Sequence, residues 1–228
     1  MLFKSKVPDV MLQTEIENRK AIEDDRKEKN NIKLSIYYDD WEPVLYDLMQ
    51  AQFTQKNFSK MKFSFNTSQN MLKKVVNDIS TVYKDNPQRK TDDEKTSELY
   101  NQILKNAKIN TVMKEVNSLF NLLNDIAIQP QWDPERQTIK LNIITPAKMS
   151  VIQDPDDPER AIAIYYEVDM QDTFTDTRKY YVYWDKDNHY LMNSDGVKIA
   201  PEDNPNMENP YGFIPFVFIH KERKWRHY

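Results

Sequence analysis

The sequence predicts an α+β fold in which N-terminal helices are followed by a small, mostly antiparallel β-rich domain. Up to about residue 125, apolar residues recur at the i, i+3, i+4 spacing of amphipathic helices. Beyond residue 126 they alternate with polar residues in short runs, and turn residues separate these runs. We therefore expect a mainly helical region over residues 1–125 and a β-rich region over residues 126–228.

Composition limits the classes of protein that fit. The chain has 228 residues, of which 39% are hydrophobic and 30% charged, so it can bury a core beneath a very polar surface. Its formal net charge of -4 argues against a protein that grips nucleic acid by its phosphates, since such domains carry a basic excess. The absence of cysteine excludes disulfides and thiolate metal sites, and two glycines do not make a phosphate-binding loop. No apolar run approaches the ~18–20 residues that span a bilayer, so we expect no membrane partner.

The start of the chain predicts two helices. Residues 11–31 are charged with few apolar anchors, and i,i+4 pairs such as Glu23 with Lys27 indicate a solvated helix. A second helix is expected from about Asp40, which is a suitable N-cap, with Pro43 in its first turn. The apolar stripe of this second helix consists of Val44, Leu45, Leu48, Met49 and Phe53.

A third helix follows a less regular segment. Residues 57–66 alternate apolar and polar side chains, which predicts a strand or an extended connection. Thr67 or Ser68 then opens an amphipathic helix with apolar residues at i, i+3, i+4 and i+7. Asn86-Pro87 ends this helix, because the residue before a proline disfavours helical backbone.

The rest of the helical region contains two periodic runs. Asp92 or Asp93 is the expected N-cap of the first run, which extends through residues 99–107. The second run covers residues 112–125. The two runs predict either one bent helix or two helices joined near residues 106–110.

Residues 138–168 show the change to strands most clearly. Ile139, Leu141 and Ile143 alternate with polar residues, as in a strand with one buried face. Pro146 ends that strand, because it has no N–H to donate to a neighbouring strand. The remainder predicts a short strand at 149–152, an exposed acidic turn at 154–158 and another strand at 162–168.

Short strands and turns make up the other parts of the β-rich region. Asp133 to Arg136 predicts a hairpin turn, and Asn193 to Gly196 predicts the strongest one in the chain, because Asp-Gly suits positive φ. Residues 201–210 contain three prolines and are expected to be irregular. Extended segments are expected at residues 126–132, 180–184, 189–192, 197–199 and 213–219.

The sequence offers few residues for catalysis. His189, His220 and His227 have no partner at i+3 or i+4 that would make a metal site on one face, so a structural or solvated role is favoured. No serine lies in the glycine-rich elbow of a hydrolase nucleophile. We predict no catalytic residue, no metal ligand and no cofactor.

Two groups of carboxylates are the candidate cation ligands. Asp154, Asp156 and Asp157 offer oxygen atoms to Ca²⁺ or Mg²⁺, but the neighbouring prolines and the missing glycine do not match a calcium loop. A solvated turn is therefore favoured there. Asp39 and Asp40 could contribute to a two-metal nuclease site, yet no second carboxylate cluster with a nearby lysine accompanies them.

Two segments could contact nucleic acid. Tyr180, Tyr181, Tyr183 and Trp184 could stack bases on an exposed sheet, although packing across strands is favoured because few basic residues interleave with them. The densest basic segment could contact DNA phosphates or an acidic neighbouring subunit, while a solvated charge run is the default interpretation. Its basic residues are Lys221, Arg223, Lys224 and Arg226. No nucleic-acid-binding residue is assigned.

From about residue 66 onward, the order of motifs resembles that of the portal proteins of tailed bacteriophages. Residues 70–87 are similar to the early helix that such proteins place ahead of their wing domain, and residues 119–128 to the helix that leads into the wing sheet. Residues 139–154 are similar to the strand, proline, strand, aspartate pattern of the family. Residues 209–217, Asn-Pro-Tyr-Gly-Phe-Ile-Pro-Phe-Val, are similar to the turn and strand that close the wing.

The resemblance implies a non-enzymatic structural protein of the virion. Its copies would form a ring, usually of twelve subunits, at one capsid vertex, assembled in the host cytoplasm. The ring would be the conduit for double-stranded DNA during packaging and ejection, and its partners would be the major capsid protein, the packaging terminase and a head–tail adaptor. A net acidic charge fits such a conduit, since attractive walls would slow the passage of DNA.

The chain also departs from the family. Portal proteins are usually longer, and neither their stem helix nor their clip and crown precede Tyr228. We therefore expect the β-rich, wing-like region to continue in a further C-terminal part. Two alternatives stay open: a metal-dependent DNA-processing nuclease that uses Asp39, Asp40 and the turn at 154–157, and a non-enzymatic head–tail adaptor.

Overall fold

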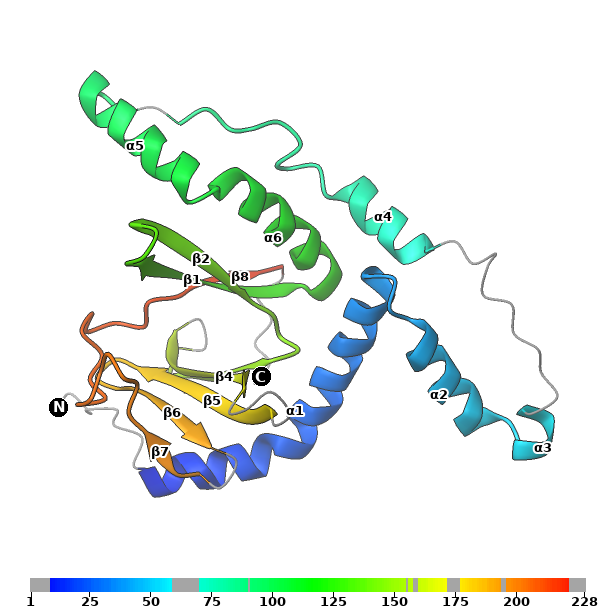
Figure 1. The fold of residues 1–228 in the computed structure, drawn as a ribbon. Helices are drawn as coiled ribbons and strands as arrows, with labels where there is room; N and C mark the ends of the chain where they lie inside the picture. The colour runs from blue at the N-terminus through cyan, green and yellow to red at the C-terminus, as the bar shows by residue number, and fades with distance from the viewer. Residues whose placement is uncertain are drawn as a thin grey trace. The chain divides into compact units, whose positions relative to one another are not determined.

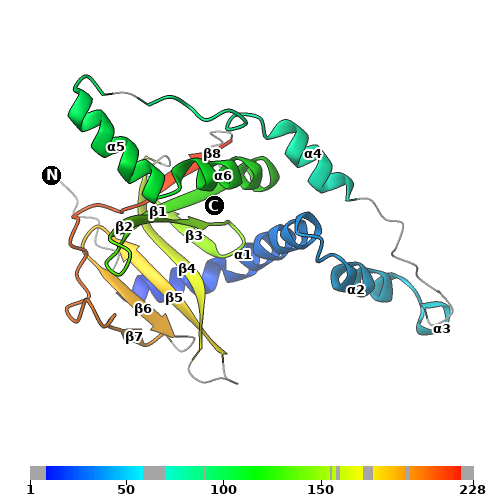
Figure 2. The ribbon, with the colours of Figure 1, turned by 45° about the horizontal axis from the view of Figure 1, so that its top comes forward.

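The computed structural model describes residues 9–58, 70–89, 91–154, 156–157, 160–171, 177–193 and 196–221. In these residues the helices come first and two antiparallel sheets follow, which confirms the predicted α+β fold (Figures 1 and 2). The helices are α1 (Asp9–Tyr37), α2 (Glu42–Gln52), α3 (Gln55–Phe58), α4 (Met71–Ile79), α5 (Glu94–Asn106) and α6 (Ile109–Leu123). The strands are β1 (Asp125–Asp133), β2 (Thr138–Ile144), β3 (Met149–Gln153), β4 (Ala161–Gln171), β5 (Thr177–Asp185), β6 (His189–Asn193), β7 (Lys198–Ile199) and β8 (Val217–His220).

The chain divides into two compact units, each built around one sheet. The five-stranded unit comprises the described residues of 1–28 and 146–216, and the three-stranded unit comprises those of 29–145 and 217–222. Secondary structure changes from helix to strand at Asp125, but each unit combines helical and strand segments. Helix α1 contributes its first part to one unit and its last part to the other.

The three-stranded unit has the strand order β2-β1-β8, with both pairs antiparallel. Helix α6 buries an apolar face against the central strand β1, which starts directly after a left-handed Asn124 (φ 71). The buried side chains of this core are Val76 of α4, Val116, Leu119, Leu122 and Leu123 of α6, and Ile126 and Ile128 of β1. The apolar face that the helical period of α6 predicts therefore packs on the first half of β1, where residues 126–129 are all buried.

The five-stranded unit has the strand order β3-β4-β5-β6-β7. Its aromatic residues pack across neighbouring strands: the rings of Tyr183 and Tyr190 stack at 4.7 Å, and those of Trp184 and His189 at 3.6 Å. Tyr183 and Trp184 are buried, so the favoured interpretation of cross-strand packing is confirmed for them and no exposed base-stacking platform includes them.

Pro146 divides the predicted 138–168 stretch between the two sheets. Strand β2 ends at Ile144 and pairs with β1, whereas β3 and β4 pair with each other in the five-stranded sheet. The predicted strands are all present, but the local pattern did not indicate that they belong to different sheets. A proline ends the first sheet here because it has no N–H for the next rung of the ladder.

Several predicted helix boundaries are wrong. Helix α1 extends to Tyr37, and its supposedly solvated face includes the buried Glu23. Helix α2 begins after Trp41, which makes no side-chain cap, so Asp40 is not the N-cap, although Pro43 does lie in the first turn. Asp93 caps α5 as predicted, by accepting a hydrogen bond from the Thr96 N–H at 2.8 Å.

Helix α4 is shorter at its C-terminal end than predicted. It ends at Ile79, several residues before Asn86-Pro87, where the Ser80 hydroxyl donates a 2.6 Å hydrogen bond to the Val76 carbonyl. Serine side chains compete in this way with the backbone bonds of a helix. Helices α5 and α6 are two separate helices, joined at the left-handed Lys108 (φ 51).

The last predicted strand is also shorter. Residues 213–216 are irregular, and only Val217–His220 forms β8. The expected strand or connection at 57–66 falls partly on α3, and its residues 59–66 lie outside the described residues. Thr67 and Ser68, His227 and most of the basic segment that starts at Lys221 also lie outside them.

Candidate subunit interface

The Asp154 carboxylate, one of the candidate cation ligands, makes its contacts within its own turn. In the acidic turn, the Asp154 carboxylate accepts a bond from the Asp156 N–H at 3.0 Å and lies 3.8 Å from the Arg160 guanidinium. The Arg160 N–H in turn donates to the Asp157 carbonyl at 2.9 Å. These contacts close the turn with its own polar groups, and Asp156 and Asp157 are exposed, as expected of a solvated turn.

The two described histidines, His189 and His220, lie in strands. His189 of β6 stacks on Trp184, and burial lowers the pKa of its imidazole. His220 of β8 places Nδ1 2.9 Å from the Asp125 carboxylate of β1, its direct partner in the antiparallel register. Among the described residues, no group of three or more His, Asp or Glu side chains is arranged to hold a metal ion.

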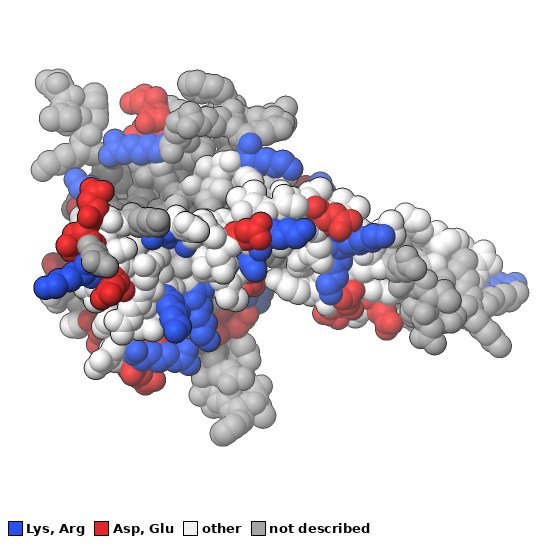
Figure 3. Space-filling view, turned by 90° about the horizontal axis from the view of Figure 1, so that it is seen from above, with Lys and Arg blue, Asp and Glu red and all other residues white. Residues whose placement is uncertain are grey.

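On the face of the molecule in Figure 3 the charges are mixed. Lysine and arginine side chains alternate there with aspartate and glutamate across uncharged areas. Such a mixture does not give the single-sign stripe that tracks a phosphate backbone. Within the described part of the chain, no helix is both long and apolar enough to cross a bilayer.

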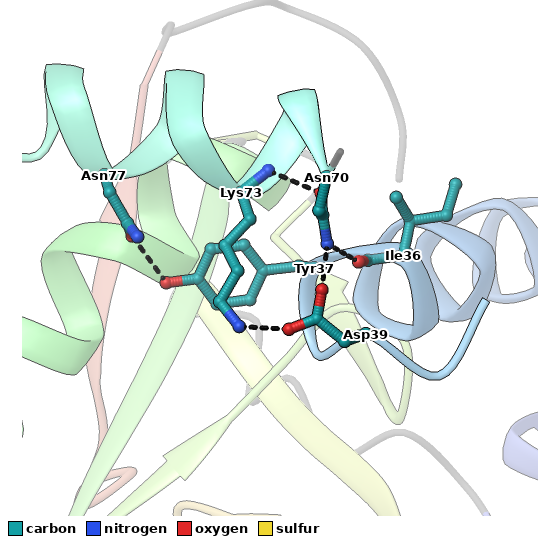
Figure 4. Close-up of polar contacts among 6 residues, drawn as sticks. All are labelled: Ile36, Tyr37, Asp39, Asn70, Lys73 and Asn77. Carbon is teal, nitrogen blue, oxygen red and sulfur yellow. Dashed lines mark hydrogen bonds and ion pairs between the residues drawn. The ribbon is translucent and has the colours of Figure 1, made fainter. Parts of the chain in front are cut away.

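Asp39, which the sequence offers as a possible metal ligand, helps to form a corner between α1 and α4 (Figure 4). Asp39 has a left-handed backbone (φ 66), which turns the chain sharply after α1. Its carboxylate pairs with the Lys73 ammonium and accepts a 2.8 Å hydrogen bond from the Asn70 side chain. The Asn70 amide also donates to the Ile36 carbonyl, so one side chain joins the end of α1 to the start of α4.

A second pair of contacts reinforces this α1–α4 corner. The Tyr37 hydroxyl lies 3.1 Å from the Asn77 side-chain oxygen, one turn further along α4 (Figure 4). Asn70 also caps α4, since its side-chain oxygen accepts a 2.8 Å hydrogen bond from the Lys73 N–H. Residues 31 to 40 positions apart along the chain are therefore joined where α2 begins. Sequence reasoning missed this site, because no local pattern links Asp39 to Asn70 or Lys73.

The electrostatics of the corner give a testable pH dependence. Hydrogen bonds from Lys73, and then from Asn70, hold the pKa of the Asp39 carboxyl below its ordinary value. We expect Lys73→Met to raise this pKa towards the ordinary value, as measured by carboxyl NMR titration. Because the folded-state pKa is depressed, the stabilisation is present above the unfolded-state pKa and is lost as pH falls through the folded-state pKa.

Lys74 provides the control for this prediction. It is the exposed neighbour of Lys73 on the same helix, and the structure gives it no bond to Asp39. Lys74→Met should therefore leave the titration of Asp39 unchanged. An equal shift in both variants would mean that general charge, rather than the Lys73 bond, sets the Asp39 pKa.

Helices α2 and α3, here called the arm (residues 42–58), extend away from the corner in Figures 1 and 2. None of the side chains of α2 or α3 is buried. Tyr46 of α2 and Phe58 of α3 form an edge-to-face pair at 4.8 Å, so the two helices of the arm contact each other. Tyr46, Leu48 and Phe53 remain exposed.

Helix α4 has apolar side chains on two sides, one packed in the core and the other exposed. Val76 is buried in the three-stranded core, whereas Met71, Val75 and Ile79 are exposed by 56%, 51% and 51%. These three residues are spaced i, i+4, i+8 and form one line along the helix, here called the α4 row. Exposed apolar lines of this kind mark interaction surfaces.

No protein-family model matches the chain, and no curated protein sequence matches it.

Proposed function

We propose that this chain is the wing-bearing part of a bacteriophage portal, a structural protein that forms a ring at one capsid vertex. The ring is the conduit for double-stranded DNA and binds the major capsid protein, the terminase and a head–tail adaptor. The proposal is supported by the order of the four motif segments and by an architecture of helices followed by antiparallel sheets. No catalytic residue or cofactor takes part in it.

The order of the four motif segments carries the proposal, and the last of them, Asn209–Val217, has the most fully described contacts. Its first residue is buried, and the Asn209 amide donates hydrogen bonds to the carbonyls of Asp185 (2.6 Å) and Phe213 (2.8 Å). The Asn209 side-chain oxygen accepts one from the Tyr211 N–H at 3.0 Å. Gly212 has a left-handed backbone (φ 68), which glycine adopts without steric cost.

These contacts give Asn209, Gly212 and Val217 structural roles. The Asn209 side chain bonds to backbone groups of the turn, and the left-handed Gly212 lets the chain reverse direction. The chain then enters β8, where Val217 pairs with Ile128 of β1. The motif therefore shapes a turn and a strand rather than a pocket for chemistry. That task fits a protein whose work is assembly.

The head–tail adaptor is retained as the second candidate, because it shares the structural role and would bind a ring without forming one. The nuclease is not retained, since Asp39 bonds to Lys73 and Asn70 and Asp154 bonds within its own turn. Magnesium-dependent DNA cleavage that Asp39→Asn or Asp154→Asn abolishes would reverse this choice.

Particle imaging of the purified full chain tests the proposal. Closed rings with a central hole are expected for a portal. If the protein stays a uniform monomer at every protein concentration imaged, the result would count against the proposal. Monomers that bind to preformed portal rings would instead support the adaptor.

A further inference from the structure

Helix α2 requires a packing partner. It has 11 residues, none of them buried, and isolated helices shorter than about 12–15 residues are marginal in water. Its sequence is nevertheless amphipathic, with Leu45, Leu48 and Met49 at helical spacing. In the described residues α2 packs mainly against the four-residue α3, which is itself fully outside the core. Among the described residues, the apolar side chains of the arm are therefore left uncovered and available to a second copy.

We propose that the arm of one copy packs on the α4 row of the next copy. The inference rests on the proposed ring and names the surfaces through which its subunits join. The arm and the α4 row are different surfaces, so the contact is head-to-tail, and such contacts close into rings when the rotation permits.

The charges beside the two surfaces favour this pairing. Residues 40–58 carry three acidic side chains and one basic one. Residues 71–84, which contain the α4 row, carry three lysines and one aspartate. The acidic residues are Asp40, Glu42 and Asp47; Lys73 is already paired with Asp39 of its own copy, so Lys74 and Lys84 are the lysines left for a neighbour. Opposite charges at the rim of an apolar contact favour this orientation over arm-to-arm or row-to-row contacts, which would place like charges together.

The available area suits a subunit contact. The three exposed apolar side chains of the arm, the α4 row and the adjacent Val82, which is 75% exposed, present on the order of 700 Å² of surface. A standard interface buries about 1,600 Å² in total, of which somewhat more than half is apolar. These seven side chains therefore supply most of the apolar part of one contact.

The α1–α4 corner gives the contact its geometry. It fixes the start of α4 and the end of α1 to each other through Asn70 and Lys73. The arm starts two residues after Asp40, so its base and the α4 row are held by the same bonds. A fixed relation between the two contact surfaces of one subunit is what sets the rotation from copy to copy.

Site-directed crosslinking tests the contact directly, because the natural chain has no cysteine. Leu48→Cys and Val75→Cys proteins are mixed and oxidised, and disulfide-linked pairs are counted on non-reducing gels. We expect these pairs to form about tenfold faster than pairs between Leu48→Cys and a control, Val217→Cys, because docking raises the effective concentration of the thiols. Val217 is also exposed, by 56%, but lies in β8.

Helical circular dichroism checks that each cysteine variant is folded, and imaging of the same samples separates the two proposals. Rings without crosslinks above the control would overturn the arm contact and leave the portal intact. Crosslinked open chains without rings would support the arm contact and count against the portal. Monomers without crosslinks would overturn both.

Discussion

Replacing Glu23 by alanine should lower the free energy of unfolding of the five-stranded unit by about 3–5 kcal/mol, the usual cost of breaking a buried ion pair. The Glu23 side chain is almost fully buried between α1 and the sheet. Its carboxylate accepts hydrogen bonds from the Ser150 hydroxyl and from the Tyr165 hydroxyl, at 3.0 Å in the second case. The Lys27 ammonium lies 3.7 Å away.

Alanine would leave all three of these partners without the carboxylate. Lys27 is itself largely buried, and burial already lowers the pKa of its ammonium, so loss of the nearby negative charge would lower that pKa further. A 3.0 Å hydrogen bond from Arg26 to the Met149 carbonyl also holds this part of α1, but it does not replace those bonds. Urea denaturation, followed by near-ultraviolet circular dichroism, measures the loss.

Two variants make the Glu23 measurement specific. Glu28→Ala removes an exposed glutamate from the same helix and should change stability by no more than about 0.5 kcal/mol. Glu23→Gln keeps one acceptor oxygen, so its loss of unfolding free energy should lie between those of Glu23→Ala and Glu28→Ala. If Glu23→Ala costs no more than Glu28→Ala, the buried carboxylate does not hold α1 on the sheet.

Replacing Asn209 by alanine should cost about 2–3 kcal/mol, because three hydrogen bonds are lost and the Asp185 and Phe213 carbonyls lose their donor. The change lies in one of the four segments that resemble a portal, so it also tests why that segment contains asparagine. Urea denaturation of the full chain measures the stability.

Asn206 offers a matched control in the same irregular segment. It is exposed, and Asn206→Ala should have almost no effect on stability. If rings form, Asn209→Ala should also weaken them, since the turn leads into β8. Equal stabilities of the two alanine variants would show that the turn does not depend on the Asn209 side chain.

Local signals predicted much of the fold. The cap at Asp93 was predictable because a carboxylate satisfies the free N–H groups at a helix start. The hairpin turn at Asp133 was predictable for a related reason: its carboxylate accepts a 3.0 Å bond from the Arg136 N–H. Each carboxylate bonds to an N–H three residues later, so both partners of the interaction lie in the same short stretch of sequence.

Interactions between distant segments were not predictable in this way. The i,i+4 pair of Glu23 and Lys27 has the same spacing on a solvated helix as on one pressed against a sheet, so the sequence indicated a solvated pair. The corner of Asp39, Asn70 and Lys73 joins two segments that have no shared pattern. Only the burial and the distances reveal these sites.

The sequence by itself determined the kinds of element and their order, because helical and strand periods, caps and prolines act over a few residues. The tertiary structure alone decided that Pro146 separates two sheets, that β8 joins β1 across the chain and that Glu23 is buried. Strand pairing and burial depend on which surfaces meet, and a strand presents the same backbone donors and acceptors to any neighbour.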